Sequence, residues 1–417
     1  MIDVEDLCAG YGGKDIISEI TFSAGKGGFI GIIGPNGSGK TTLLKAISRV
    51  LDISGGVVTL EGRALSDFGQ KELARTVGVV PQETAMNFSY TVADIVMMGR
   101  FPHKERFVKE DTEDYRIVRE AMEVTNVAHL ADRLVTDISG GERQRVIIAR
   151  ALAQQPKVIL LDEATAHLDI NHQVEILSIV RDLGESVTKI GVFHDLNLAA
   201  EFCDRIVLMM EGRIRAIGTP AEVLTMERLR DGYGITAMVQ TNPVTGRPLV
   251  TPLSEGVSPA LCGARIHLIS GGGTGAGLMY MLAAAGCILT AGVLSPMDSD
   301  YMAASRLGIP CITVPAFAPI TPAVCDALGA YLDEADVVIL TAMPVGEGNL
   351  PNIRALTRAR CSRLVLYVPG GEEFTDCTPA GDCSYLAKIR AAGCRVVSSR
   401  NALYKEVEKL VHTRNKA

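Results

Sequence analysis

Three features are missing from this sequence, and each absence argues against a class of protein. There is no basic, apolar leader at its start, no pair of cysteines in a CxxC pattern and no excess of positive charge. Without a leader we expect no secretory signal, so the ten cysteines are interpreted as reduced cytosolic thiols. The net charge of −7 argues against a general nucleic-acid binder.

Charge is also absent from the stretch 276–294, which approaches the length of a transmembrane helix. This stretch follows a glycine-rich loop, and Gly286 divides it into a helix-like half, 277–285, and a strand-like half, 287–293. Buried elements of α/β domains have this composition. We therefore expect no membrane span, and any role at a membrane must come through a partner.

The length of 417 residues favours two domains over one. Hydrophobic residues make up 47% of the chain and charged residues 21%, which is typical of a globular protein rather than a disordered or fibrous one. The stretch 255–417 carries 14 acidic and 14 basic side chains, whereas the preceding part carries 34 and 27. All the excess negative charge therefore belongs to the first part.

The first part is organised around the loop 34–41, which reads GPNGSGKT. The apolar run Phe29–Ile33 precedes this loop, and the helix-compatible stretch 42–48 follows it. In such an order, backbone N–H groups and a helix N-terminus converge on phosphate oxygens. We predict a nucleotide site in which Lys40 reaches the β- and γ-phosphates and the Thr41 hydroxyl holds Mg²⁺. The residues expected at the nucleotide are Gly34, Pro35, Asn36, Gly37, Ser38, Gly39, Lys40, Thr41 and Thr42.

Polar side chains directly follow three apolar strands of the same part. Gln82 comes after Val77–Val80, Asp162 and Glu163 come after Val158–Leu161, and His194 comes after 189–193. Because parallel sheets bind ligands at the carboxyl ends of their strands, these side chains should face the nucleotide. We predict that Gln82 and Asp162 serve Mg²⁺, that Glu163 polarises the attacking water and that His194 contacts the γ-phosphate. The alternative for the two acids is capping of the next helix.

Two further features belong to the predicted site. Tyr11 lies in a glycine-bounded loop, where its ring could stack on adenine. Ser139, Gly140, Gly141 and Glu142 open a helical pattern, 146–153, and predict a second anion site at a helix N-terminus. This second site need not serve the nucleotide held by Lys40, because two copies packed head to tail could each close the other's site.

Taken in order, these residues resemble the nucleotide-binding subunits of ABC transporters over 1–252. Tyr11 matches the aromatic loop, 34–41 the Walker A motif, Gln82 the Q-loop, 139–142 the signature, 158–163 the Walker B motif, 166–169 the D-loop and His194 the switch histidine. The resemblance implies a P-loop ATPase that uses ATP and Mg²⁺, in which Glu163, His194 and Gln82 are catalytic and Asp169 belongs to the nucleotide site. Ile138 and Ala164 replace the usual Leu and Pro, and neither change removes a polar group.

Two stretches, Met98–His103 and 242–248, are similar to the ATPases of importers for iron–siderophore complexes, haem and vitamin B12. The resemblance implies a homodimer at the cytoplasmic face of the membrane, two copies of a polytopic permease and an extracytoplasmic substrate-binding protein. The first stretch would lie in a helical subdomain, about 85–155, whose groove receives the permease. Solvated loop positions for Arg100 and His103 are the alternative.

Two other functions stay open. A soluble ABC ATPase of DNA repair would carry a long coiled coil between the motifs, and one of translation would carry two cassettes. Here Gln82 and Ser139 are 57 residues apart, and no second GxxxxGK[ST] occurs. The other alternative is an importer ATPase fused to an enzyme that processes the imported cofactor.

Prolines and glycines mark 242–259 as a connection poor in regular structure, with the linker itself at 253–262. Beyond it, apolar runs alternate with helix-like segments, which predicts a second, smaller Rossmann-like α/β domain over 263–417 with a parallel sheet of about six strands. The predicted strands are 267–270, 287–294, 311–314, 337–342, 364–368 and 395–398, and an amphipathic helix, 402–416, closes the chain.

The first of these strands leads into the loop 271–277, GGGTGAG, which fits G-x-G-x-x-A and predicts a phosphate or other anion site. The acid expected after the second strand of a dinucleotide site is absent, since Ser295 stands there. The loop and its helix faintly resemble the lysine-decarboxylase-like nucleotide-binding domains.

Other loops of the second domain should gather at the same edge of the sheet, and their residues are Asp298, Asp300, Pro315, Pro344, Glu347, Gly370 and Gly371. We predict that they line a ligand pocket. The preferred role is a sensor that biases the ATPase dimer by binding a nucleotide or a piece of the transported cofactor. An enzyme active site, or loops rich in Pro and Gly for turn reasons alone, are the alternatives. Cys377 and Cys383, in a loop-like segment, are interpreted as free thiols rather than metal ligands.

Overall fold

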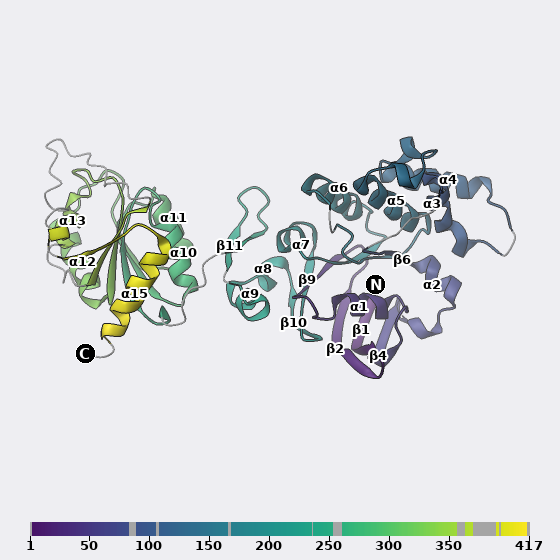
Figure 1. Ribbon diagram of the computed structural model, residues 1–417, viewed down its shortest axis with the longest axis horizontal. Coiled ribbons are helices and arrows are strands. Elements are labelled where there is room, and N and C mark those ends of the chain that lie inside the picture. The colour runs from purple at the N-terminus through teal and green to yellow at the C-terminus, as the bar shows by residue number, and fades with distance from the viewer. Residues whose placement is uncertain are drawn as a thin grey trace. The chain divides into compact units, whose positions relative to one another are not determined.

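The computed structural model describes residues 2–82, 89–105, 108–165, 168–235, 237–252, 261–356, 363–369, 389–391 and 393–414. The chain forms two compact units, one of Met1–Gly234 with Val239–Val250 and one of Ile235–Met238 with Thr251–Ala417. Both are of the α/β class (Figure 1). In the described ranges, every helix is too short or too polar to cross a bilayer.

The first unit contains two sheets, with strand orders β2-β1-β4-β5 and β10-β9-β3-β8-β7-β6. The smaller sheet is antiparallel, and in the larger one β6, β7, β8, β3 and β9 run parallel while β10 is antiparallel to β9. The strands are β1 (Ile2–Tyr11), β2 (Lys14–Ala24), β3 (Phe29–Ile33), β4 (Ile53–Leu60), β5 (Arg63–Ala64), β6 (Val77–Val80), β7 (Val158–Leu161), β8 (Thr188–Val192), β9 (Arg205–Met210) and β10 (Arg213–Gly218).

Strands β3, β7 and β8 are buried at every position. Their continuous apolar runs suit the centre of a parallel sheet, because both of its faces are covered. The helix α1 (Lys40–Ile47) packs between the two sheets, where Leu43 and Ile47 contribute to one core shared by both. The loop before α1 is therefore fixed at both of its ends by buried elements.

The remaining helices of the first unit begin at capped N-termini in most cases. Ser139, Asp169 and Thr91 each accept a hydrogen bond from a backbone N–H in the first turn of the helix that follows. The helices are α2 (Gln70–Thr76), α3 (Val92–Met97), α4 (Thr112–Val124), α5 (Gly140–Ala153), α6 (Ile170–Arg181), α7 (Leu196–Phe202), α8 (Pro220–Val223) and α9 (Met226–Tyr233), with short 3₁₀ turns η1 (Leu65–Asp67), η2 (Met98–His103), η3 (Ala128–Leu130) and η4 (Val135–Asp137).

The prediction that 242–259 is poor in regular structure is wrong in part. A two-stranded sheet pairs β11 (Ala237–Thr241) with β12 (Pro248–Pro252). Its prolines stand at the first and last positions of β12, where a two-stranded ribbon tolerates a missing backbone donor. Most of the predicted linker, 253–260, lies outside the described residues.

The second unit contains one parallel sheet in the order β15-β14-β13-β16-β17-β18, which confirms the predicted Rossmann-like class. Numbered along the chain this order is 3-2-1-4-5-6, the doubly wound arrangement. The strands are β13 (Arg265–Ile269), β14 (Ile288–Leu294), β15 (Cys311–Thr313), β16 (Val337–Thr341), β17 (Leu364–Tyr367) and β18 (Arg395–Val397).

Helices cover both faces of this sheet (Figure 1). One face packs against α10 (Ala276–Ala284), α11 (Ser299–Arg306) and α15 (Arg400–Arg414), and the other against α12 (Pro322–Glu334) and α13 (Leu350–Leu356). The charge-free stretch 276–294 forms α10 and β14, which meet at Gly286 as expected. Its apolar composition reflects burial inside a three-layer domain.

Candidate active site

The glycine loop of the first unit is shaped by backbone that only glycine adopts without strain. Gly34 has φ 155° and Gly39 has φ 96°. A Cβ atom at Gly34 would lie 2.2 Å from the carbonyl oxygen of Met209, and one at Gly39 would lie 2.5 Å from the side chain of Ile17. The loop is therefore packed tightly against β9 and β2, and its shape is fixed before any ligand binds.

Lys40 lies at the start of α1 and its side chain is buried. Its Nζ donates to the carbonyl oxygens of Gly34 at 2.9 Å and Pro35 at 3.0 Å, so the loop wraps around the ammonium group. Burial lowers the pKa of Lys40, and the negative charges of Glu163 and Asp162 partly counter this effect. The lysine is thus a positive charge held inside the loop, close to two carboxylates.

Carboxylates at the end of β7 complete this cluster. Thr41 Oγ1 donates to Asp162 Oδ1 at 3.2 Å, and burial raises the pKa of Asp162. Glu163 is held from two sides, by Gln82 Nε2 at 2.5 Å and by His194 Nε2 at 2.6 Å. The carboxyl ends of β6, β7 and β8 and the start of α1 therefore bring Gln82, Asp162, Glu163, His194 and Thr41 together, as the sequence predicts.

The backbone of Glu163 is itself strained, with φ 49° in the left-handed region. A non-glycine residue in this region typically costs about 1 kcal/mol or more, and such residues gather at functional sites. With this backbone, the Glu163 carboxylate contacts Gln82 and His194. The next helix along the chain that the structure describes, α6, is capped by Asp169, so the structure does not favour a capping role for Glu163.

A second cluster forms around the N-terminus of α5. Ser139 is exposed, and its N–H and Oγ both contact Glu142 Oε2 at 2.7 Å in a capping box. A Cβ atom at Gly141 would lie 2.5 Å from the His172 ring, whose Nδ1 lies 2.8 Å from Asp169 Oδ2. Across the described residues, no hydrogen bond or ion pair joins this cluster to the Lys40 cluster.

Two predicted features remain, Tyr11 and the D-loop. Tyr11 ends β1 next to its turn into β2, and 48% of its side chain is exposed. A half-exposed ring at a glycine turn is free to stack on a planar ligand. Of the predicted D-loop, Ala166 and His167 lie outside the described residues, while Asp169 is exposed and caps α6.

Comparison with known proteins decides what this arrangement is. The family model described as ABC transporter matches residues 17–166. Cobalamin import ATP-binding protein BtuD of Halobacterium salinarum is 37% identical over 379 residues, covering 90% of this chain and 94% of that protein. The chain belongs to the ABC transporter ATP-binding proteins. It is therefore an ATPase of the P-loop class.

Other similarities divide between the two units of this ABC ATPase. Ferric enterobactin transport ATP-binding protein FepC of Escherichia coli is 40% identical over 253 residues, covering 60% of this chain and 93% of that protein. The solved ATP-binding cassette MJ1267 in its ADP conformation has a TM-score of 0.52 and 25% identity, over 56% of this chain and 98% of that one. The second unit is matched separately, by a model described as the MJ0874 family, at residues 289–404.

In the stretch Met98–His103 of this ABC ATPase, the alternative of a solvated loop position is wrong for Arg100. Arg100 is buried and its Nε donates to Asp114 Oδ1 at 3.0 Å, while its Nη1 donates to the carbonyl oxygen of Ala153. His103 Nε2 lies 2.9 Å from the carbonyl oxygen of Gln154, and burial lowers its pKa. These two side chains tie η2 to α4 and α5, with Arg100 buried and His103 partly buried. The place of this stretch in a groove that receives the permease stays a prediction.

The glycine loop of the second unit does not form the predicted anion site. Asp300 is fully buried and its carboxylate accepts hydrogen bonds from the N–H groups of Gly275 and Ala276 at the N-terminus of α10. Asp298 Oδ2 accepts a further one from Gly272 N–H at 2.9 Å. Two carboxylates of the same chain therefore satisfy the donors that a phosphate would need, and a phosphate placed there would meet like charge.

The other residues predicted at this edge have different positions. Asp298, Pro315, Pro344 and Glu347 line one cavity, whereas Asp300 lies beneath the loop. Gly370, Gly371, Cys377 and Cys383 lie outside the described residues. Several cavity residues escaped the sequence analysis, among them Phe317 and Asn352. The run of alternating small residues and prolines around Phe317 is the one sequence signal that could have pointed to a strained, exposed ring.

Proposed function

We propose that this ABC ATPase energises the import of a metal chelate through a separate permease, and that a corrinoid is the cargo. Supporting this, the BtuD match covers 90% of the chain and so extends through both units, whereas the FepC match covers 60%. A relative that shares both units is a better guide to cargo than one that shares the cassette alone. Iron–siderophore complexes and haem are the other chelates in this class.

The proposed chemistry is transfer of the γ-phosphoryl group to water. Glu163 would accept the proton of the attacking water, with its carboxylate aimed by Gln82 and His194. Lys40 and the N–H groups of 34–41 would bind the phosphates, and Tyr11 would stack on the base. The Thr41 hydroxyl, the Asp162 carboxylate and the Gln82 amide offer the oxygen ligands that Mg²⁺ prefers, and this ion would neutralise phosphate charge there.

We also propose a homodimer in which the N-terminus of α5 from one copy closes the nucleotide site of the other. Ser139 and Gly140 are exposed, and Ser139 is oriented by its capping box without contact to the Lys40 cluster of its own chain. Asp169, fixed to α5 through His172 and Gly141, would lie in the same interface. ATP would then bind the closed dimer more tightly than the open one, and this difference is the source of work.

The permease would dock on the helical part of the first unit. A cavity of about 510 Å³ lies there among α3, α4 and η3, and its lining includes Met97, Tyr115 and Met122. Apolar side chains in a groove between helices suit an amphipathic helix of a membrane partner. Two copies of the permease, an extracytoplasmic substrate-binding protein and a place at the cytoplasmic face of the membrane follow from this role.

For the domains we propose 1–252 as the ATP-binding part, with a helical subdomain at about 85–155, then a linker at 253–262 and a ligand-sensing part at 263–417. The sensing role rests on the cavity at the strand ends of the second unit. An enzyme that processes the imported cofactor is the alternative for this part, and a soluble ATPase uncoupled from transport is the alternative for the whole.

Reconstitution tests the proposal directly. The ATPase would be co-purified with a candidate permease and placed in proteoliposomes, and uptake of cyanocobalamin, haem and a ferric siderophore would be compared. We expect ATP-dependent uptake of the corrinoid above the other two, and none with Glu163→Gln. Full hydrolysis activity without any binding to the permease would reject the transport role in favour of the soluble ATPase.

A further inference from the structure

A cavity of about 750 Å³ in the second unit opens at the carboxyl ends of β13, β14, β15 and β16. In the sheet order β15-β14-β13-β16 the chain changes direction between β13 and β16, and doubly wound sheets bind ligands at this switch point. A volume of this size accommodates a small organic molecule. The location and size together therefore mark a binding site, independent of the Lys40 cluster.

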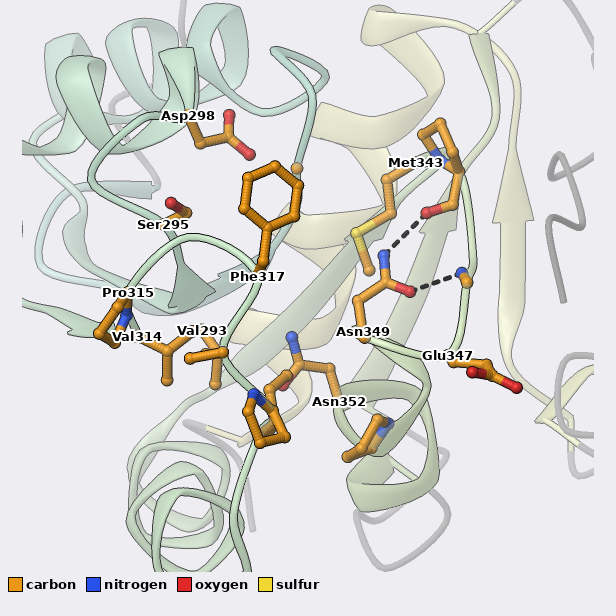
Figure 2. A pocket seen from close by; sticks show the side chains of 18 of the residues that line it. Val293, Ser295, Asp298, Val314, Pro315, Phe317, Met343, Glu347, Asn349 and Asn352 are labelled. Carbon is orange, nitrogen blue, oxygen red and sulfur yellow. Dashed lines mark hydrogen bonds between the residues drawn. The ribbon is translucent and has the colours of Figure 1, made fainter.

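The walls of this cavity are apolar, and one aromatic ring stands free over it. Val293, Val314 and Met343 contribute apolar surface. Phe317 is fully exposed and has φ 63°, a left-handed backbone that is unusual for a bulky residue. Figure 2 shows its ring standing near Asp298, across the space from Met343. Because the phenyl ring is exposed, it gains no stabilisation from hydrophobic burial, although the strained backbone costs free energy. A flat ligand stacked on the ring would bury it.

Polar groups of opposite kind lie at two sides of the same space. Asn352, at the start of α13, is 1% exposed, and its Oδ1 is closed off from solvent without a hydrogen-bond partner. Figure 2 shows the nitrogen of this amide, a hydrogen-bond donor, directed towards the space beneath Phe317. On the other side, Asp298 uses one lone pair of each oxygen for the N–H groups of Gly272 and Asp300, which leaves others for a ligand. The space therefore presents an amide donor on one side and carboxylate acceptors on the other.

The neighbouring Asn349 has a different task. Its Nδ2 donates to the carbonyl oxygen of Pro344 and its Oδ1 accepts from Gly346 N–H, both at 2.8 Å (Figure 2). These bonds close the loop between β16 and α13. Asn349 therefore shapes the wall of the cavity, and one N–H and one lone pair of its amide are already used within the loop.

Charge excludes a phosphate from this site. Of the lining residues that the structure describes, none is Lys, Arg or His, while Asp298 and Glu347 are acidic. The N–H groups at the start of α10, the other usual phosphate partner, already bind Asp300. A phosphate would thus meet two carboxylates and no cation, whereas hydroxyl and amino groups would meet acceptors.

We propose that this cavity binds a phosphate-free nucleoside, with its base stacked on Phe317, its hydroxyl or amino groups donating to Asp298 and an acceptor atom of the base or sugar receiving a hydrogen bond from the Asn352 amide nitrogen. A nucleoside offers the flat ring, the donors and the acceptors that these groups can meet, without the charge that the site rejects. A nucleoside would then be the ligand sensed by the second unit. Binding itself does not depend on the sensing role proposed above, but an effect of the nucleoside on ATP hydrolysis does.

Binding is measured by isothermal titration of the full chain, with Mg-ADP saturating the Lys40 site throughout. The probes are adenosine, guanosine, cytidine and uridine, each beside its 5′-monophosphate. We expect at least one nucleoside to bind, and its monophosphate to bind at least about tenfold more weakly. If no nucleoside binds, or if a monophosphate binds as tightly as its nucleoside, the inference is overturned.

Variants then place the bound nucleoside. Phe317→Ala removes a side chain that packs on nothing, so the fold is unaffected, and we expect about a tenfold loss of affinity. Asn352→Leu should also weaken binding, with its thermal unfolding recorded alongside. Phe101→Ala is the matched control, since Phe101 is an exposed phenylalanine of the first unit and should leave affinity unchanged. Unchanged affinity in Phe317→Ala and Asn352→Leu would overturn the assignment of the cavity.

The rate of ATP hydrolysis, measured in a separate nucleoside titration with Mg-ATP in place of Mg-ADP, separates this inference from the sensing role. A nucleoside that changes the rate in the wild-type chain, but not in Phe317→Ala, supports both. Binding that depends on Phe317 while the rate stays constant supports the site and rejects the sensing role.

Discussion

The two glycine loops of this chain look alike in sequence and differ in what their backbone N–H groups meet. Each follows a buried strand of a parallel sheet and leads into a helix, and each has an exposed aromatic side chain nearby, Tyr11 or Phe317. In the first loop a lysine lies inside the turn and bonds only to its carbonyl oxygens. In the second loop Asp300 occupies the helix N-terminus with a carboxylate.

We infer that the charge of the side chain already bound at each loop, positive for Lys40 and negative for Asp300, decides which loop binds phosphate. The number of glycines does not decide this. A helix N-terminus attracts an anion in both units. Lys40 leaves the helix N-terminus open to an anion and adds a positive charge, whereas the Asp300 carboxylate already occupies the N-terminus of α10. The first unit is accordingly an ATPase, and the second has a cavity suited to an uncharged ligand.

The largest expected effect is that of replacing Glu163, the carboxylate proposed to accept the proton of the attacking water. Glu163→Gln should lower ATP hydrolysis by about 10²- to 10⁴-fold, because the amide cannot take a proton from water. ATP binding should persist, since Gln keeps the size of the side chain, and the variant should accumulate as an ATP-bound dimer. Steady-state phosphate release and gel filtration with ATP measure the two effects. An unchanged hydrolysis rate would remove Glu163 from the mechanism.

Next in size is the effect of removing the carboxylate from the second loop. Asp300→Ala leaves the N–H groups of Gly275 and Ala276 without their acceptor, so the second unit should lose about 2–4 kcal/mol of unfolding free energy. Asp298→Ala is the control, and it should cost about 1 kcal/mol as the loss of a helix cap. Denaturant unfolding with and without Mg-ATP assigns the transitions, because ATP raises only that of the first unit. Equal losses in both variants would contradict the special role of Asp300.

A smaller effect appears on acidification, and it should differ between the units. Burial alone would raise the pKa of Asp114, but hydrogen bonds from Lys104, the Asp111 N–H and Arg100 lower it to about 2. This depressed pKa stabilises the first unit above pH ~4, and about 2–3 kcal/mol should be lost as the pH falls towards 2. Asp300 has the opposite shift, since burial raises its pKa, so its protonation favours the folded second unit.

Unfolding free energies from pH 7 to pH 2 test this contrast between the buried acids. Asp114→Asn should flatten the pH dependence of the first unit and leave the second unit unchanged. If both units lost stability in parallel and Asp114→Asn altered neither curve, the assignment would be wrong.

The smallest expected effect is at the aromatic ring beside the first loop. Tyr11→Ala should raise the KM for ATP about tenfold through loss of stacking, with little change in kcat, because the ring touches the base rather than the reacting phosphate. Tyr11→Phe keeps the ring and should behave as the wild type. A fall in kcat at constant KM would show that Tyr11 acts elsewhere.

The sequence predicts the first loop well because its partners are marked locally. Strands β3, β6 and β7 have the predicted bounds, since each is a short apolar run that ends directly at a motif residue. The strands of the second unit agree within about two residues for the same reason. Where burial is continuous and the next residue is polar, composition alone locates the end of a strand.

What the sequence could not reveal depends on distant pairs. Asp300 reaches the second glycine loop from 25 residues away, after another strand, so the loop pattern gives no sign of it. Arg100 in η2 forms a buried ion pair with Asp114 in α4, although the sequence suggests that both residues are exposed to solvent. Asn352 becomes a ligand candidate only once tertiary packing has buried its amide.

Nucleotide should bind at the first loop and at no other, and equilibrium dialysis of Mg-ATP against Glu163→Gln and Lys40→Ala tests this expectation. We expect one ATP per chain in Glu163→Gln and none in Lys40→Ala. Two ATP per chain in the first variant, or one retained in the second, would show that the glycine loop beside Asp300 also accepts phosphate and would contradict this expectation.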